Sequence, residues 1–243
     1  MTNIPYAELT AAVRGEGEAI VAAARMGLDV AVPTCGDWQM PDLLRHVAAV
    51  YHRAATAVDQ RATQPVEWQA PGDDGADPIA VLADALDELV HALSGADADT
   101  AVWNWSGRDQ NASFWARRMA HESAVHRFDA QRAHGMAQPI DADLAHDGLD
   151  ELVDVIAPRV VERDQVELTE ATYSFVATDE GVWHVQFGPD GLQRLDVAKE
   201  PDVTARGTAS ALLLAAYARV PWTSLEVDGD MAALDAWNAS LRF

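Results

Sequence analysis

The spacing of apolar residues changes near Pro139, and this change limits the folds that the chain can adopt. Before Pro139, apolar residues recur every three or four positions over long segments, which is typical of amphipathic helices. After one more helical segment, residues 172–198 alternate apolar and polar residues, and turn sequences separate the runs, a pattern that predicts β-strands. We therefore expect a helical unit over residues 1–138 and an α+β unit over residues 139–243.

The same patterns predict the individual elements. In the first unit we expect four helices, at residues 6–26, 41–58, 78–94 and 113–134, the last with Ser113 as N-cap and Gly135 as C-cap. In the second unit, a helix over residues 141–163 is interrupted or ended near Pro158. A meander of three antiparallel strands follows, and then a fourth strand and two helices end the chain.

The fourth predicted helix contains the segment HESAVH, residues 121–126, which resembles a metal-binding motif without matching it. A zinc protease motif places two histidines four residues apart, whereas His121 and His126 are five apart and about 140° from each other around a helix. Glu122 and His126 are four apart and share one face. They could bind a metal together, or they could form a surface ladder of ion pairs with Arg118, and the spacing leaves both readings open.

Composition restricts the ligands and partners. The chain of 243 residues has one cysteine, Cys35, so a metal would have to be held by His, Asp or Glu, and we expect Cys35 to be structural. A net charge of −22 argues against binding to nucleic acid or to anionic membranes. No apolar run is long enough for a membrane span and no signal peptide is recognisable, so we expect a cytoplasmic protein, either a monomer or a homodimer.

Several segments together resemble the mycothiol-dependent maleylpyruvate isomerase family. They are DWQMPDLLRHVAAV, WNWSG, FWARRMAHESAVHRFDAQRAHG and the segments from DVTARG to the end of the chain. The resemblance implies a DinB-like four-helix bundle followed by a small sterol-carrier-like α+β domain with an antiparallel sheet. It also implies a zinc ion in the bundle, held by His46, Glu122 and His126.

Three protein ligands with one open position are typical of a catalytic zinc site. Zinc favours the thiolate form of a thiol, so an external thiol such as mycothiol would become a nucleophile without any protein cysteine. The resemblance then implies a cis–trans isomerase acting on maleylpyruvate or a similar small electrophile, or an S-transferase if the thiol stays attached. Two other functions stay open: a small-ligand-binding module with a structural or absent metal, and a thiol-independent metal hydrolase.

Other residues are candidates for supporting roles. Arg118 and Arg206 are the candidate catalytic residues, as clamps for an anionic substrate. Asp129 could orient His126 from one turn away, and Trp105 and Trp115 could line a pocket beside the predicted metal helix. Relatives commonly have Gly-Arg where this chain has Ala218-Arg219, which sets this turn apart from the family pattern.

Overall fold

The computed structural model describes residues 4–69, 75–164, 166, 170–188 and 191–241, and it divides into two compact units between Gln138 and Pro139. The first unit contains four helices among its described residues: α1 (Tyr6–Ala24), α2 (Met40–Asp59), α3 (Pro78–Ser94) and α4 (Ala112–Ala133). The second contains α5 (Ala142–Glu151), a π-helical turn η1 (Leu152–Ile156), α6 (Ala157–Asp164), α7 (Ala209–Ala216), a short 3₁₀ helix η2 (Trp222–Ser224), α8 (Met231–Ser240) and the strands β1–β5.

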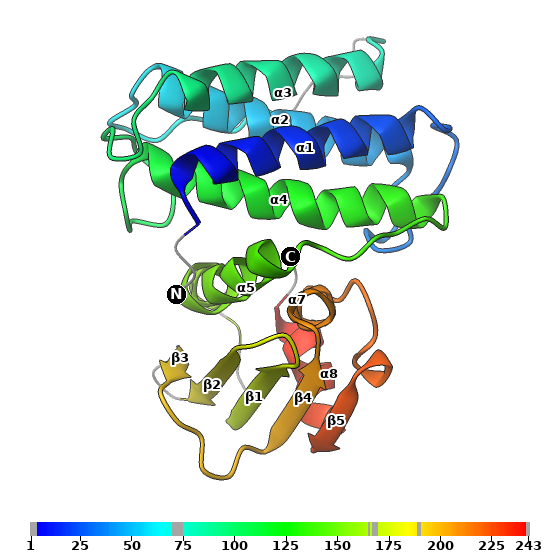
Figure 1. Ribbon diagram of the computed structural model, residues 1–243, viewed down its shortest axis with the longest axis vertical. Coiled ribbons are helices and arrows are strands. Elements are labelled where there is room, and N and C mark those ends of the chain that lie inside the picture. The colour runs from blue at the N-terminus through cyan, green and yellow to red at the C-terminus, as the bar shows by residue number, and fades with distance from the viewer. Residues whose placement is uncertain (1–3, 70–74, 165, 167–169, 189–190, 242–243) are drawn as a thin grey trace. The chain divides into compact units, whose positions relative to one another are not determined.

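The four helices of the first unit lie side by side as a bundle (Figure 1). His52 of α2 contacts Glu88 of α3 at 3.1 Å, and Figure 1 shows that α2 and α3 run in the same direction. Tyr6 at the start of α1 donates to the carbonyl of Leu93 at the end of α3, so α1 runs the opposite way. The bundle core consists of fully buried apolar side chains, among them Val13, Ile20, Leu43, Leu44, Val47, Leu82, Leu89 and Met119.

Local sequence determines where these helices begin. Gln39 and Asp42 form a capping box at the start of α2, where Pro41 lacks the N–H that would otherwise need a partner. Asp77 caps α3 by accepting from the N–H of Ile79. The predicted cap of α4 is wrong by two residues: Asn111, not Ser113, accepts from the N–H of Phe114, because the Asn111 backbone is extended.

The strands of the second unit are β1 (Ala171–Ala177), β2 (Val182–Gly188), β3 (Gly191–Leu195), β4 (Val203–Gly207) and β5 (Glu226–Gly229). They form one sheet in the order β3-β2-β1-β4-β5. The predicted antiparallel meander is confirmed for β1, β2 and β3. The sheet as a whole is mixed, because β4 pairs with β1 in parallel. It also contains the short strand β5, which the sequence pattern does not predict.

One face of this sheet carries the core of the second unit. Tyr173 and Phe175 of β1 and Phe187 of β2 contact Trp237 of α8, with ring centroids 5.3–5.4 Å apart. Trp237 also donates from its indole N–H to the carbonyl of Ala216 in α7, which satisfies the buried donor. The helix expected over residues 141–163 is interrupted near Pro158, as predicted, by the π-helical turn η1, and it continues as α6 with Pro158 as its second residue.

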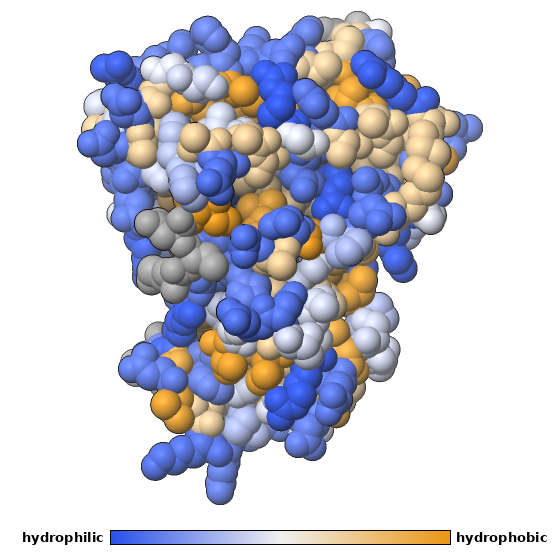
Figure 2. Space-filling view, in the orientation of Figure 1, coloured by the Kyte–Doolittle hydropathy of each residue, from blue (hydrophilic) through white to orange (hydrophobic). Residues whose placement is uncertain are grey.

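The face of the molecule shown in Figure 2 is largely hydrophilic. Hydrophilic residues are spread over the visible face, and smaller apolar areas lie between them (Figure 2). Among the described residues, no helix is both long and apolar enough to cross a membrane.

Candidate metal centre

Helices α2 and α4 bring together the three residues that the resemblance nominates. The Glu122 Oε1 atom lies 3.3 Å from His46 Nε2 and 3.3 Å from His126 Nε2. One ligand atom from each residue lies within 4.8 Å of the other two. His46 comes from α2, 76 positions earlier in the chain than Glu122, so only the packing of the two helices makes the cluster possible. Two nitrogen donors thus converge on one carboxylate oxygen.

A layer of hydrogen bonds surrounds these three side chains. Arg118 donates from Nη2 to the other oxygen of Glu122, at 3.0 Å. Asp129, whose side chain is fully buried, lies 2.9 Å from His126 Nδ1, so the Nδ1–H donates to the carboxylate and Nε2 is left facing Glu122. Cys35 also contacts Asp129, at 3.4 Å from sulfur to Oδ2. The predicted orienting role of Asp129 therefore has the contact that it requires.

The electrostatics of the cluster favour an ionised Glu122. Burial raises the pKa of this carboxyl, but hydrogen bonds from His126 and His46 and the charges of His126 and Arg118 outweigh burial, so the pKa lies well below its usual range. Burial lowers the pKa of His126, yet its contacts with Asp129, Cys35 and Glu122 raise that pKa well above its ordinary value. Both shifts favour the ionised form of Glu122 beside a protonated His126 in the metal-free protein.

Comparison with known proteins identifies the family. A family model described as the mycothiol maleylpyruvate isomerase N-terminal domain matches residues 6–131, more than half of the chain. A second model, described as the MDMPI C-terminal domain, matches residues 143–236.

The chain belongs to the mycothiol maleylpyruvate isomerase family.

The prediction of this family, and with it of an enzyme of the mycothiol-dependent isomerase type, is confirmed.

Two solved structures share the fold. The crystal structure of the mycothiol-dependent maleylpyruvate isomerase is similar with a TM-score of 0.66, and that of a mutant of this isomerase with a TM-score of 0.65. In both comparisons the identity is 14%, and the match covers 94% of this chain and 95% of the other. At this identity, the similarity shows a common fold. A comparison with curated proteins finds no match.

In this family member, two tryptophans that the sequence analysis did not select lie beside the cluster. The ring of Trp38 lies 5.0 Å from the His46 ring, and that of Trp68 lies 6.2 Å from it. Trp68 is 47% exposed. Both residues lie outside helices and strands, so no periodic pattern marks them. Both rings lie next to the imidazole of His46.

The other residues that the sequence singled out have contacts of their own. Trp115 is 2% exposed and donates to the carbonyl of Trp103, so it belongs to the bundle core and lines no pocket mouth. Trp105 packs edge-on against Phe114. Arg206 belongs to the second unit. It lies in β4 opposite Glu226, two residues before Thr208, which is the N-cap of α7.

Arg219 and Ala218 form the turn that departs from the family pattern. Ala218 has a positive φ of 60°, a conformation that glycine adopts without strain, so the glycine that the family resemblance leads one to expect at this position would suit the turn. Arg219 is buried and donates to the carbonyl of Tyr217.

Proposed function

We propose that the protein is a zinc- and mycothiol-dependent isomerase or S-transferase that acts on a small conjugated electrophile. The observation that carries this proposal is the convergence of His46 Nε2 and His126 Nε2 on Glu122 Oε1, each at 3.3 Å. The corresponding domain proposal is a DinB-like metal-binding bundle over residues 1–138 and a sterol-carrier-like domain over residues 139–243.

The donor set fits a zinc ion. Tetrahedral zinc with bonds of about 2.0–2.1 Å to nitrogen and oxygen keeps its ligand atoms about 3.3 Å apart, which equals the two separations found here. The Nδ1–H of His126 is already bonded to the carboxylate of Asp129, as in most metal-binding histidines. A second group, Cys35, His126 and Asp129, also lies within 4.8 Å. It is the weaker candidate, since Asp129 is fully buried there and already hydrogen-bonded to both other members.

Each residue around the ion would have a definite task. Glu122 stays ionised and supplies Oε1, while Arg118 holds its other oxygen and prevents the carboxylate from rotating. Asp129 fixes the imidazole of His126 so that Nε2 faces the centre. When bound, zinc lowers the pKa of a thiol that reaches its open position, so the thiol becomes a nucleophile at neutral pH. The side chain of His46 is 31% exposed, which marks the side from which the thiol would approach.

The family name suggests the reaction. The sulfur of the thiol adds to one carbon of a conjugated cis double bond, and the electron pair moves onto the adjoining carbonyl, so the former double bond becomes a single bond that can rotate. Elimination then breaks the carbon–sulfur bond and restores the double bond in the trans arrangement and the free thiol. An S-transferase results if a proton is captured at carbon and elimination does not occur.

The test is turnover of maleylpyruvate by the zinc-loaded protein, with and without mycothiol. We expect isomerisation only when mycothiol is present. Turnover that continues without any thiol would instead indicate a hydrolase using water on the same bundle.

A further inference from the structure

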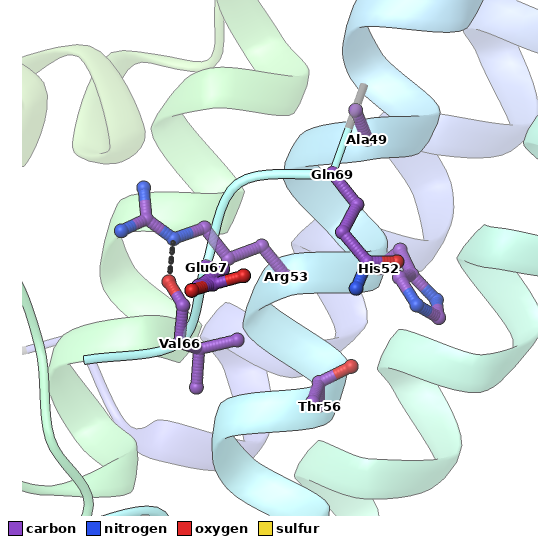
Figure 3. Close-up of a pocket in the computed structure, with 7 residues that line it drawn as sticks. All are labelled: Ala49, His52, Arg53, Thr56, Val66, Glu67 and Gln69. Atoms are coloured by element: carbon purple, nitrogen blue, oxygen red, sulfur yellow. Dashed lines mark hydrogen bonds between the residues drawn. The ribbon is translucent and has the colours of Figure 1, made fainter. Parts of the chain in front are cut away.

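A polar cavity lies on α2, one helical turn beyond His46. It is lined by Ala49, His52, Arg53 and Thr56 of α2 and by Val66, Glu67 and Gln69 of the connection to α3 (Figure 3). Arg53 donates from Nε to the carbonyl of Val66 at 3.0 Å, which fixes this connection against the helix. The guanidinium of Arg53 also lies 5.3 Å from the ring of Trp103. The cavity is therefore bounded on both sides by anchored chain.

The chemistry of the lining suits a ligand rich in hydroxyl groups. Thr56 and Gln69 each both donate and accept hydrogen bonds, Glu67 accepts them and Arg53 donates them. Arg53 and Glu67 carry opposite charges, so the lining has no excess of one sign that would select an anion. Its volume of about 80 Å³ is room for several hydroxyl groups, since a group the size of a water molecule needs about 10–15 Å³ by the same measure.

Trp68 lies between two of the lining residues in the chain, and it adds an apolar surface at the side of the metal centre. Its indole is 47% exposed and its ring lies 6.2 Å from that of His46. A flat aromatic face with one N–H at its edge is a suitable partner for a sugar ring, whose C–H groups lie on its faces and whose hydroxyls lie at its rim.

The spacing along α2 matches an extended small molecule. Arg53 and Thr56 follow His46 by seven and ten residues, which corresponds to about 10–15 Å along a helix. A ligand of this length could place a thiol at His46 and a polyol in the cavity. Mycothiol has these two ends, since it carries an N-acetylcysteine on a hydroxyl-rich pseudodisaccharide.

We propose that the cavity between α2 and residues 66–69, together with the ring of Trp68, binds the pseudodisaccharide end of the thiol cosubstrate. This proposal rests on the proposed function for the role of the thiol end, but the cavity itself belongs to residues that hold no metal. It makes Thr56, Gln69 and Trp68 determinants of thiol specificity.

The test compares mycothiol with N-acetylcysteine, which has the same thiol end and lacks the sugars. For the zinc-loaded protein, the ratio of kcat/KM for mycothiol to kcat/KM for N-acetylcysteine should fall about 3- to 10-fold in Thr56→Val, in Gln69→Ala and in Trp68→Ala. Thr63→Val and Gln64→Ala are matched controls, because both residues are exposed in the same connection and neither lines the cavity. An unchanged ratio in all three variants would overturn the proposal.

Calorimetry with the pseudodisaccharide alone separates this proposal from the proposed function. We expect the wild-type protein to bind it and Trp68→Ala to bind it at least about 3-fold more weakly. If neither thiol supports turnover, the proposed function fails, and this binding measurement still decides the role of the cavity. No binding to the wild-type protein would contradict the cavity proposal even in an active enzyme.

Discussion

Replacing Asp129 by Asn tests how the protein orients His126. The Asp129 side chain is fully buried and its Oδ2 accepts from His126 Nδ1 at 2.9 Å. Asparagine has the same shape and still offers an oxygen, but it turns a hydrogen bond to a charged group into a neutral one. Hydrogen bonds to charged groups contribute about 1.5–3 kcal/mol and neutral ones about 0.5–1.5 kcal/mol. The variant should therefore lose about 1–1.5 kcal/mol of the free energy of zinc binding, because His126 is held less firmly in its binding orientation. That loss corresponds to about 5- to 13-fold weaker zinc binding.

The assay is a titration of zinc between the protein and a fluorescent chelator at constant pH. Asp87→Asn is the control. The Asp87 side chain is 70% exposed and forms an ion pair with Arg14, and neither residue belongs to the cluster. We expect the control to bind zinc like the wild-type protein and both variants to keep their helix content. Equal zinc affinity in Asp129→Asn and in the control would refute the orienting role.

Three further predictions follow from single contacts. Arg118→Gln should lower the free energy of unfolding of the metal-free protein by about 1.5–3 kcal/mol, because it removes a hydrogen bond between two charged and largely buried groups. The loss should be smaller in zinc, which supplies the missing positive charge. Equal losses in urea denaturation with and without zinc would contradict this. A Cβ at Gly17 would lie 2.6 Å from Leu86 of α3, whereas one at Gly15 meets nothing within 4 Å, so Gly17→Ala should be about 1–3 kcal/mol less stable than Gly15→Ala, and similar thermal stability of the two would contradict this packing. If Arg206 binds the anionic group of the electrophile, Arg206→Gln should raise KM for that substrate about 10-fold without loss of zinc. An unchanged KM would contradict this role of Arg206.

The sequence predicts the parts of the fold that depend on local patterns. The four long helices and the meander β1–β2–β3 follow from the two periodicities. The parallel pairing of β4 with β1 does not follow, because alternation shows that a segment is a strand and not which strand it joins. The strand β5 has only four residues, Glu226–Gly229, too few to show a period.

The candidate metal centre shows the same limit. Spacing alone places Glu122 and His126 on one face of α4, but His46 joins them only through the packing of α2 against α4, and the family resemblance was needed to select it. Trp38 and Trp68 approach His46 from irregular segments, where neither period applies. Trp115 looked like a pocket residue because it lies on α4, yet its position faces the bundle core.

The most direct test of the account is the zinc content of the purified protein after dialysis, measured beside Glu122→Gln. Glutamine keeps the shape of the side chain and removes the charge on which the two histidines converge. We expect about one zinc per wild-type chain and almost none in the variant, with the same helix content in both. Absence of zinc from the wild-type protein, or equal zinc in both proteins, would contradict a metal centre at His46, Glu122 and His126.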